Sequence, residues 1–198
     1  VAWQWKANGG TTASNTDGNL TSTVQANQDA GFSIVTFTTD GATKTFGHGL
    51  GVKPDMVIVK SRSGSGAWIA MTDVIDGSVD YLILNATNAA ADLSYGAFTS
   101  STFQYNDNNA VTQVAYCFAS KQGYSKFGKY VGNGNANGPM VYLGFKPAFL
   151  MTKRTDTTGN WLMYDNKRIG HNPNNYEIYA NLSSVEEDND RMDILSNG

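Results

Sequence analysis

Two stretches of the chain carry the same pattern and decide its fold: Gly49–Lys60 reads GLGVKPDMVIVK, and Leu143–Lys153 reads LGFKPAFLMTK. Each places glycine and a Lys-Pro pair directly before a run of apolar residues. Glycine tolerates the positive φ of a turn, and proline favours an extended conformation in the residue before it. Both stretches therefore predict a turn that leads into a buried β-strand.

The similarity continues on both sides of these stretches, in the same order along the chain. At shifts of 92 to 96 residues, the matched positions are Gly31 with Gly123, Lys53 with Lys146, Trp68 with Trp161, Tyr81 with Tyr176, and Asn85 with Asn181. Self-similarity at a fixed period is the sequence signature of tandem structural units. We therefore predict a first repeat at residues 31–122 and a second repeat at residues 123–198.

The composition indicates the fold class of these repeats. Small polar residues are abundant, with 21 Gly, 20 Asn, 19 Thr and 15 Ser among 198 residues, and 12% of residues are aromatic. Gly, Asn, Thr and Ser favour turns and strands over helix interiors. Several short strands per repeat, with closely spaced turn signals, are typical of sandwiches and jelly rolls. The prediction is an all-β chain of two tandem β-sandwich units, jelly-roll or concanavalin-like.

The last strand of the first repeat has a counterpart at the other end of the chain. Val114–Ala119 is an apolar run that predicts a strand buried on both faces. The second repeat stops before its closing strands, while Val1–Lys6 has the same apolar-small-aromatic-x-aromatic pattern. Either the chain is a window from a longer array, or Val1–Lys6 completes the second repeat in the same chain or in a neighbouring subunit. Val1, Trp3 and Trp5 are the candidate assembly residues.

The segment between this strand and the first repeat is polar. Residues 7–30 are rich in Asn, Thr, Gly and Ser and contain almost no large apolar residue. We predict an ordered connector or an extended arm between units, with a flexible linker as the alternative. Residues 1–30 would then comprise the closing strand of a unit followed by this connector.

The charge distribution excludes several classes of partner. Fourteen basic and 17 acidic residues give a formal net charge of −3 and a pI near 5.2. Without a basic cluster, nucleic-acid binding is not expected. No apolar run approaches the ~20 residues of a membrane span, so membrane insertion is not expected either. The single cysteine, Cys117, is predicted to be a small buried hydrophobe, and no cofactor is expected.

The titratable residues give no catalytic pattern. His48 and His171 do not match each other across the repeat, and surface or turn positions are expected for both. The acidic run Glu186–Asp193 could bind calcium, but a solvated acidic loop is favoured because the run does not fit an EF-hand. The alternating carboxylates of sugar-cleaving enzymes on lectin-like sandwiches are missing. We therefore predict a protein that is not an enzyme and holds no catalytic residue or metal.

Aromatic and amide side chains are the remaining candidates for ligand contact. Trp68 and Trp161 occupy equivalent repeat positions, which favours a shared core role. Rings near turns and amides in loops suit the apolar faces and hydroxyls of sugars, although such residues also form ordinary turns. The candidate contacts are Tyr95, Tyr105, Asn106, Asn108, Tyr164 and Asn172.

The linked motifs resemble a known family. Gly47–Arg62, Val114–Ala119, Gly123–Gly128 and Trp161–Arg168 together look like the repeated domain of virion structural and tail-fibre-like proteins of marine bacteriophages, notably those of cyanobacteria. The resemblance covers most of residues 31–198. It implies lectin-like β-sandwiches in an extracellular virion appendage, and it carries over no binding or catalytic residue.

Two hypotheses about function follow from the sequence and the resemblance. The first is a non-enzymatic structural component of a phage tail fibre or similar appendage, a homo-oligomer or a partner of other virion proteins that contacts the host surface. The second is a carbohydrate-binding, lectin-like module of an extracellular protein, with host surface glycans as its ligand.

Overall fold

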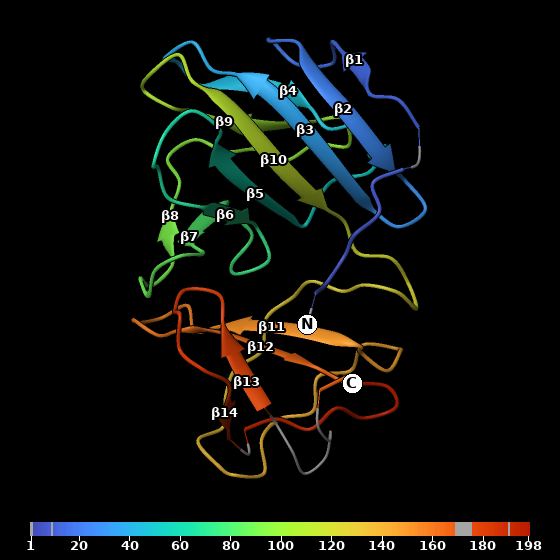
Figure 1. Ribbon diagram of the computed structural model, residues 1–198, viewed down its shortest axis with the longest axis vertical. Coiled ribbons are helices and arrows are strands. Elements are labelled where there is room, and N and C mark those ends of the chain that lie inside the picture. Colours follow the sequence, from blue (N-terminus) through green and yellow to red (C-terminus); the bar gives the residue numbers. More distant parts are fainter. Residues whose placement is uncertain (1, 9, 169–175, 190) are drawn as a thin grey trace. The chain divides into compact units, whose positions relative to one another are not determined.

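The computed structural model describes residues 2–8, 10–168, 176–189 and 191–198. These residues form strands, turns and loops without a helix, so they offer no helical membrane span (Figure 1). The all-β prediction is therefore confirmed. In chain order the strands are β1 Ala13–Asn15, β2 Ser22–Asn27, β3 Phe32–Thr38, β4 Lys44–Gly47, β5 Met56–Ser61, β6 Ile69–Thr72, β7 Asp80–Ile83, β8 Ala91–Asp92, β9 Thr102–Tyr105, β10 Thr112–Phe118, β11 Phe149–Lys153, β12 Trp161–Asp165, β13 Tyr176–Tyr179 and β14 Glu187–Asp188.

The chain divides into two compact units. The first unit comprises Ala2–Ile83 and Ala90–Phe127, and the second comprises Leu84–Ala89 with Gly128–Gly198. The division after Phe127 lies five residues beyond the predicted start of the second repeat. Leu84–Ala89 belongs to the second unit, where the Gly159 amide donates a hydrogen bond to the Thr87 carbonyl at 2.9 Å.

An eight-stranded antiparallel sheet forms the body of the first unit, in the order β1-β2-β3-β10-β5-β6-β7-β8. β10 lies in its middle and pairs with β3 along its whole length and with β5 from Gln113 onward. Side chains of β10 alternate between buried and half-buried, because successive residues of a strand point to opposite faces. The closing strand is thus confirmed, whereas its predicted burial on both faces is wrong.

A second layer covers one face of this sheet. β4 and β9 pair as a two-stranded sheet, and each contributes a wholly buried ring, Phe46 and Phe103. Phe37 of β3 packs against both rings, with centroid separations of 4.1 Å to Phe46 and 5.6 Å to Phe103. The hydrophobic core therefore lies between two β layers, as in a β-sandwich.

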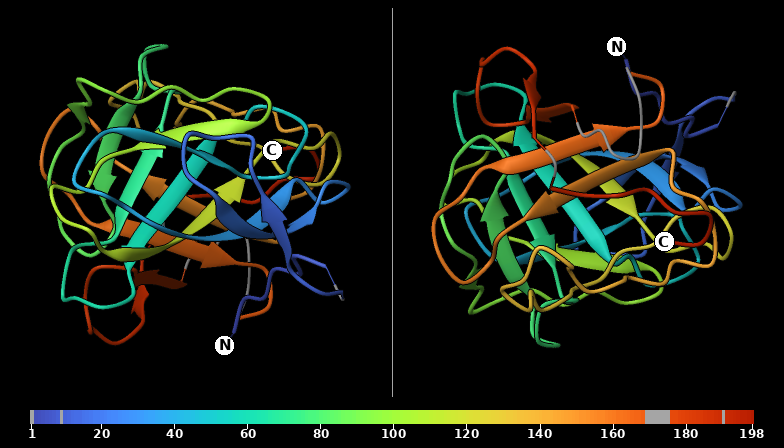
Figure 2. Two further views of the ribbon diagram at one scale, coloured as in Figure 1. Left: turned by 90° about the horizontal axis from the view of Figure 1, so that it is seen from above. Right: turned by 90° about the horizontal axis from the view of Figure 1, so that it is seen from below.

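The segment predicted as a connector instead belongs to the first unit. β1 and β2 lie within residues 7–30, and β2 pairs with β3 from Thr23 to Asn27 (blue in Figure 2). A strand needs an inward side chain only at every second residue, and β2 supplies Ser22 and Val24. The Ser22 hydroxyl donates to the Gly47 carbonyl at 2.7 Å. A polar composition therefore hid the two outer strands β1 and β2, and the connector prediction is wrong.

The second unit contains a four-stranded antiparallel sheet, β11 to β14 in sequential order. β5 to β8 of the first unit follow one another in the same way. Met56 pairs with Thr72 and Phe149 pairs with Asp165, so both strands of this hairpin are shifted by the same 93 residues. The sequence repeat is therefore a structural repeat with a shared pairing register.

One predicted match in the repeat needs a correction. The sequence placed Tyr81 opposite Tyr176 in the alignment, at a shift of 95. Ile69 pairs with Ile83 and Leu162 pairs with Tyr179, so this strand is shifted by 96 residues. Glu177 therefore occupies the position of Tyr81. The loop before β13 is one residue longer than the alignment of Tyr81 with Tyr176 implied.

The second unit has fewer strands than the first. Residues 128–148 contain no strand, although the corresponding part of the first unit includes β4 and the end of β3. Beyond β14, the described residues of the second unit form no strand equivalent to β10. The meander that the two units share, β5–β8 in the first and β11–β14 in the second, is thus complete in both. Among the described residues, the strands that flank it are present only in the first unit.

Candidate functional site

The edge of β11 opposite β12, with which no described strand pairs, is the main structural difference between the two meanders, β5–β8 and β11–β14. β5 pairs with β6 on one side and with β10 on the other. β11 pairs with β12 and lies at the end of its sheet among the described strands. All five residues of β11 are half-buried, whereas Val57, Ile58 and Val59 of β5 are buried. An edge strand with free N–H and C=O groups is a template for pairing with another chain.

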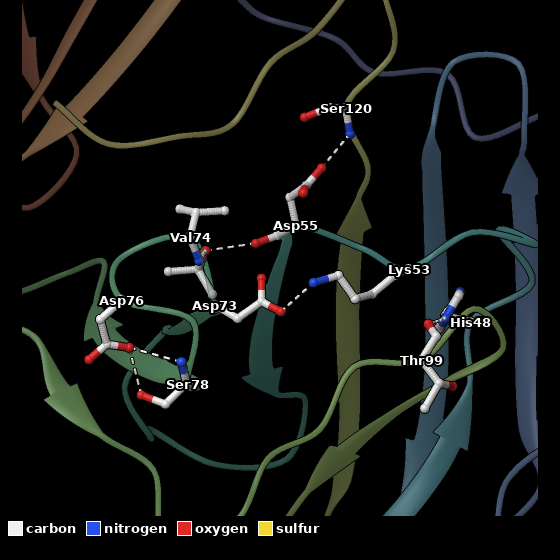
Figure 3. A network of polar contacts seen from close by, with 10 residues as sticks. His48, Lys53, Asp55, Asp73, Val74, Asp76, Ser78, Thr99 and Ser120 are labelled. Atoms are coloured by element: carbon white, nitrogen blue, oxygen red, sulfur yellow. Dashed lines mark hydrogen bonds and ion pairs between the residues drawn. The ribbon is translucent and has the colours of Figure 1, made fainter.

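The first unit shows what a completed edge looks like. The amide of Asp55, just before β5, donates to the Phe118 carbonyl at the end of β10 at 2.8 Å. The Asp55 carboxylate accepts a hydrogen bond from the Ser120 amide at 2.6 Å (Figure 3). Asp55 therefore fastens the closing strand to β5. Ala148 occupies the equivalent place in the second unit and has no carboxylate for this contact.

Large apolar side chains are exposed in the strandless part of the second unit. Tyr130 is 52% exposed, Val131 83% and Tyr142 64%, and Met140 is exposed as well. Residues of the corresponding part of the first unit, such as Phe37 and Phe46, are buried in its core. Contiguous exposed apolar patches mark interaction surfaces, so these residues are candidates for contact with another chain.

The candidate assembly segment at the N-terminus forms no strand over Ala2–Lys6. Trp5 packs edge to face on Phe118 at a centroid distance of 6.1 Å, and the Lys6 carbonyl accepts a hydrogen bond from the Asn27 side chain. Trp5 remains 44% exposed and Trp3 is half-buried. Completion of the second repeat by this segment, in the same chain or in a neighbouring subunit, therefore stays a prediction. Val1 lies outside the described residues.

Two of the predicted sugar-contacting rings are buried. Tyr105 belongs to the core of the first unit, with 8% of its surface exposed, and Tyr164 is 3% exposed. Tyr105 shares the inward face of β9 with Phe103, and the Tyr164 hydroxyl donates to the buried Glu177. Their predicted role as exposed stacking surfaces is wrong. Burial, followed by the nearby charge of Asp107, raises the pKa of Tyr105 to about 12.

The other candidate ligand contacts lie around one turn of the first unit. The Tyr95 hydroxyl donates to the Asn106 carbonyl at 3.2 Å, and the Tyr95 ring is half-buried. Asn106 is half-buried and Asn108 is exposed. The structure therefore brings Tyr95 and Asn106 together, and their contact with a ligand stays a prediction. Asn172 lies outside the described residues.

The residues match one family. Residues 1–198 match the model of a family described as a domain of unknown function, DUF7483. The chain belongs to this family. No curated protein and no solved structure matches the chain. Function must therefore be argued from the geometry of this DUF7483 chain itself.

A buried carboxylate organises the inner face of the second meander. Glu177 is wholly buried and accepts hydrogen bonds from the Tyr164 hydroxyl at 2.7 Å, the Tyr179 hydroxyl at 2.7 Å and the Asn189 amide at 2.8 Å. Burial and these contacts raise the pKa of both tyrosines. Sequence reasoning missed this network because it placed Glu177 one residue out of register. The donors around Glu177 compensate a charge that would otherwise be costly to bury.

His48 is buried, in contrast to the surface position that was expected. Its Nδ1 accepts a hydrogen bond from the Leu50 amide at 3.1 Å, and its Nε2 donates to the Thr99 carbonyl at 3.2 Å (Figure 3). This pattern requires the neutral imidazole, and burial lowers its pKa. His48 therefore fixes the turn before β5 and bears no resemblance to a solvent-exposed proton-transfer group. His171 lies outside the described residues.

The described members of the acidic run Glu186–Asp193 include carboxylates that bond to protein groups. Glu186 forms an ion pair with Arg168 at 2.5 Å, and Glu187 accepts a hydrogen bond from the Tyr179 hydroxyl at 2.7 Å. These contacts agree with an acidic loop bound to its own unit. The calcium alternative for this run stays untested.

The core roles predicted for Cys117, Trp68 and Trp161 agree with the structure to different degrees. Cys117 is wholly buried in β10, and burial raises its pKa to about 12. Trp161 is buried in β12. Trp68 is half-buried and stacks on Tyr116 at a centroid distance of 6.2 Å. Cys117 and Trp161 are therefore confirmed as packing residues, and Trp68 packs only in part.

Proposed function

We propose that this chain is a non-enzymatic structural component of an extracellular virion appendage such as a phage tail fibre. Its β-sandwich repeats, of jelly-roll or concanavalin-like type, join through sheet edges into a homo-oligomer that contacts the host surface. The resemblance to virion tail-fibre-like proteins gives the biological setting. The edge of β11 with which no described strand pairs, in a repeat whose counterpart β5 is paired on both sides, is the observation that carries the assembly mechanism.

The shared register supports assembly through this edge. β11 and β12 pair as β5 and β6 do, so β11 offers an incoming strand the same geometry that β5 offers β10. In the first unit, β10 forms six aligned pairs with β5, from Gln113 to Phe118. A strand added to β11 would satisfy backbone groups in the same way and would extend the sheet by one strand.

The N-terminal segment of a second copy is the proposed occupant of the β11 edge. Val1-Ala2-Trp3-Gln4-Trp5 follows the pattern of Val114-Ala115-Tyr116-Cys117-Phe118, so Trp3 and Trp5 correspond to Tyr116 and Phe118. Ala2–Lys6 forms no strand within its own chain, and Trp5 is 44% exposed. Addition to a neighbour would bury more of both tryptophans, which is a hydrophobic gain.

Sedimentation velocity over a range of protein concentrations tests the proposal. We expect association that Gln4→Pro abolishes, because proline removes a backbone donor from the added strand. Met151→Lys, which places a charge on β11, should abolish it as well. Val52→Lys is the control, since Val52 is exposed and lies before β5, whose edge is already paired.

Two outcomes would count against assembly through β11. One is a monomer at every concentration, and the other is an oligomer that neither Gln4→Pro nor Met151→Lys weakens. Binding of the monomer to host glycans, lost in Tyr95→Ala or Asn108→Ala, would instead favour the carbohydrate-binding alternative.

A further inference from the structure

Three aspartates meet at the β7–β8 edge of the first unit. Asp80 of β7 and Asp92 of β8 are direct cross-strand partners, and Asp76 comes from the loop before β7. Each residue has a carboxylate oxygen within 4.8 Å of an oxygen from both of the others. Like charges directly opposite each other on neighbouring strands are destabilising. The cluster therefore has an electrostatic cost that a bound cation would remove.

Asp80 adds an observation of a different kind. Its side chain is buried, with 3% of the residue exposed, and its Oδ2 has no hydrogen-bond partner. None of the ion pairs in the described part of the chain involves Asp80 or Asp92. A buried carboxylate oxygen without a donor is costly, and native proteins compensate such groups with a donor, an ion or water. The charged neighbours of Asp80 within 4.8 Å are two further carboxylates, those of Asp76 and Asp92.

The third carboxylate is held in place by its own loop. Asp76 Oδ1 accepts hydrogen bonds from the amide and the hydroxyl of Ser78, at 2.9 Å and 2.6 Å (Figure 3). Such contacts orient a ligating carboxylate in metal sites. Asp76 and Asp92 are exposed, so water has access to the remaining coordination positions.

We propose that Asp76, Asp80 and Asp92 form a calcium-binding site in the first unit. Calcium takes several oxygen ligands at ~2.3–2.6 Å in a flexible geometry, carboxylates among them. The three carboxylate oxygens lie within 4.8 Å of one another, so one cation can contact all three. Magnesium demands a near-ideal octahedron at ~2.0–2.1 Å and is usually held by only one or two carboxylates. A site of three carboxylates completed by water therefore suits calcium better.

The second unit shows that the fold does not require this cluster. At the shift of 96 residues, Tyr176 replaces Asp80, and Asp188 is the counterpart of Asp92. Tyr176 and Asp188 are cross-strand partners in the second unit. A tyrosine therefore faces an aspartate there, where two aspartates face each other in the first unit. The proposed site therefore lies outside the acidic run in which sequence reasoning considered calcium.

Calorimetric titration of the full chain with calcium chloride tests the site, together with thermal unfolding in 10 mM calcium. Weak, solvent-accessible sites have dissociation constants of about 10⁻⁴–10⁻³ M, so this calcium concentration should lower the unfolding equilibrium constant of the first unit about 10- to 100-fold. Magnesium at the same concentration should have a smaller effect.

Asp92→Asn and Asp188→Asn are the matched variants, because the two aspartates occupy equivalent edge positions. Asp92→Asn should abolish the calcium response, and without calcium it should be at least as stable as the wild type, since it removes a repulsion. Asp188→Asn should keep the response. The site is overturned if calcium gives neither heat nor stabilisation, if Asp92→Asn still responds, or if the response is lost in Asp188→Asn.

Discussion

The meander β5–β8 and the meander β11–β14 have the same strand order and the same register, yet they bury very different amounts of apolar surface. Val57 and Val59 of β5 are wholly buried, whereas Leu150 and Thr152 at the equivalent positions of β11 are half-buried. The strand pairing of the meander therefore does not depend on how deeply its side chains are buried. Burial comes from the strands added around it, which are β3, β10, β4 and β9 in the first unit.

The two inner faces differ in chemistry as well as in burial. Met71 and Tyr81 pack on the apolar core of the first unit, while Tyr164 and Glu177 occupy the corresponding places in the second. Trp161, Tyr164 and Glu177 are nonetheless buried, although no described strands of the second unit correspond to β4 and β9. The second unit instead stabilises its face by hydrogen bonds to a buried carboxylate.

Truncation of a core ring should show the largest difference in unfolding free energy between equivalent parts of the two units. Phe37→Ala removes a buried ring that contacts Phe46, Phe103 and Tyr105, and we expect a loss of about 3–5 kcal/mol in unfolding free energy. Tyr130→Ala, in the strandless part of the second unit, should change it by less than about 0.5 kcal/mol. Urea unfolding of both variants measures this, and similar losses would show that Tyr130 is also a core residue.

Removal of one hydroxyl tests whether the Glu177 network stabilises the second unit. Tyr164→Phe deletes a buried hydrogen bond to a charged acceptor, which should cost about 1.5–3 kcal/mol. Tyr179→Phe is the control, because the half-buried Tyr179 hydroxyl is shared between Glu177 and Glu187 and should matter less. Equal and negligible losses from chemical unfolding would contradict a stabilising network.

Substitution of two equivalent glycines tests whether the two units share the same turn before β5 and β11. Gly51 and Gly144 lie 93 residues apart and both have positive φ, at 72° and 83°. A side chain in this conformation costs about 1–2 kcal/mol, so Gly51→Ala and Gly144→Ala should lose similar amounts. The shared turn would be refuted if thermal or chemical unfolding shows that only one substitution is destabilising.

Acid should weaken the first unit through His48. Burial lowers the pKa of His48 in the folded state, so below a pH of about 6.5 the unfolded chain binds a proton that the folded chain does not. The contribution of His48 is therefore full above that pH and falls as the pH drops, by at most about 1.4 kcal/mol per pH unit.

His48→Gln isolates this effect, because glutamine can keep one acceptor and one donor without titrating. Asp80 acts in the opposite direction, since burial and the contact with Asp92 raise its pKa to about 6, and acid therefore favours its folded state. Comparing the pH dependence of wild type and His48→Gln cancels the Asp80 contribution. A wild type that loses no more stability than His48→Gln between pH 7 and pH 5 would contradict the role of His48.

Strands that depend on local sequence patterns were predicted correctly. Strands and buried side chains that depend on tertiary neighbours were missed. The all-β class and the strands around Val57, Val114 and Trp161 followed from apolar runs and turn residues. β2 was missed because Ser22 and Val24 serve a core that the neighbouring β3 creates. Tyr105, at the end of β9, and His48, directly after β4, looked exposed because nothing in the sequence showed that these strands would form the second layer of the core.

The candidate sites were harder to predict than the fold. Asp76, Asp80 and Asp92 span 17 positions of sequence and come together only because β7 and β8 pair. The β11 edge was foreseen in outline, because the repeat showed that closing strands were missing. The state of Ala2–Lys6, which has no strand in its own chain, required the structure.

The most direct test of assembly through β11 is hydrogen–deuterium exchange, followed by mass spectrometry, at low and high protein concentration. Amides of β11 and of Ala2–Lys6 should become protected together as the concentration rises, while those of β5 stay equally protected throughout because β10 already covers them. Protection of β11 that is the same at every concentration would contradict strand addition between copies.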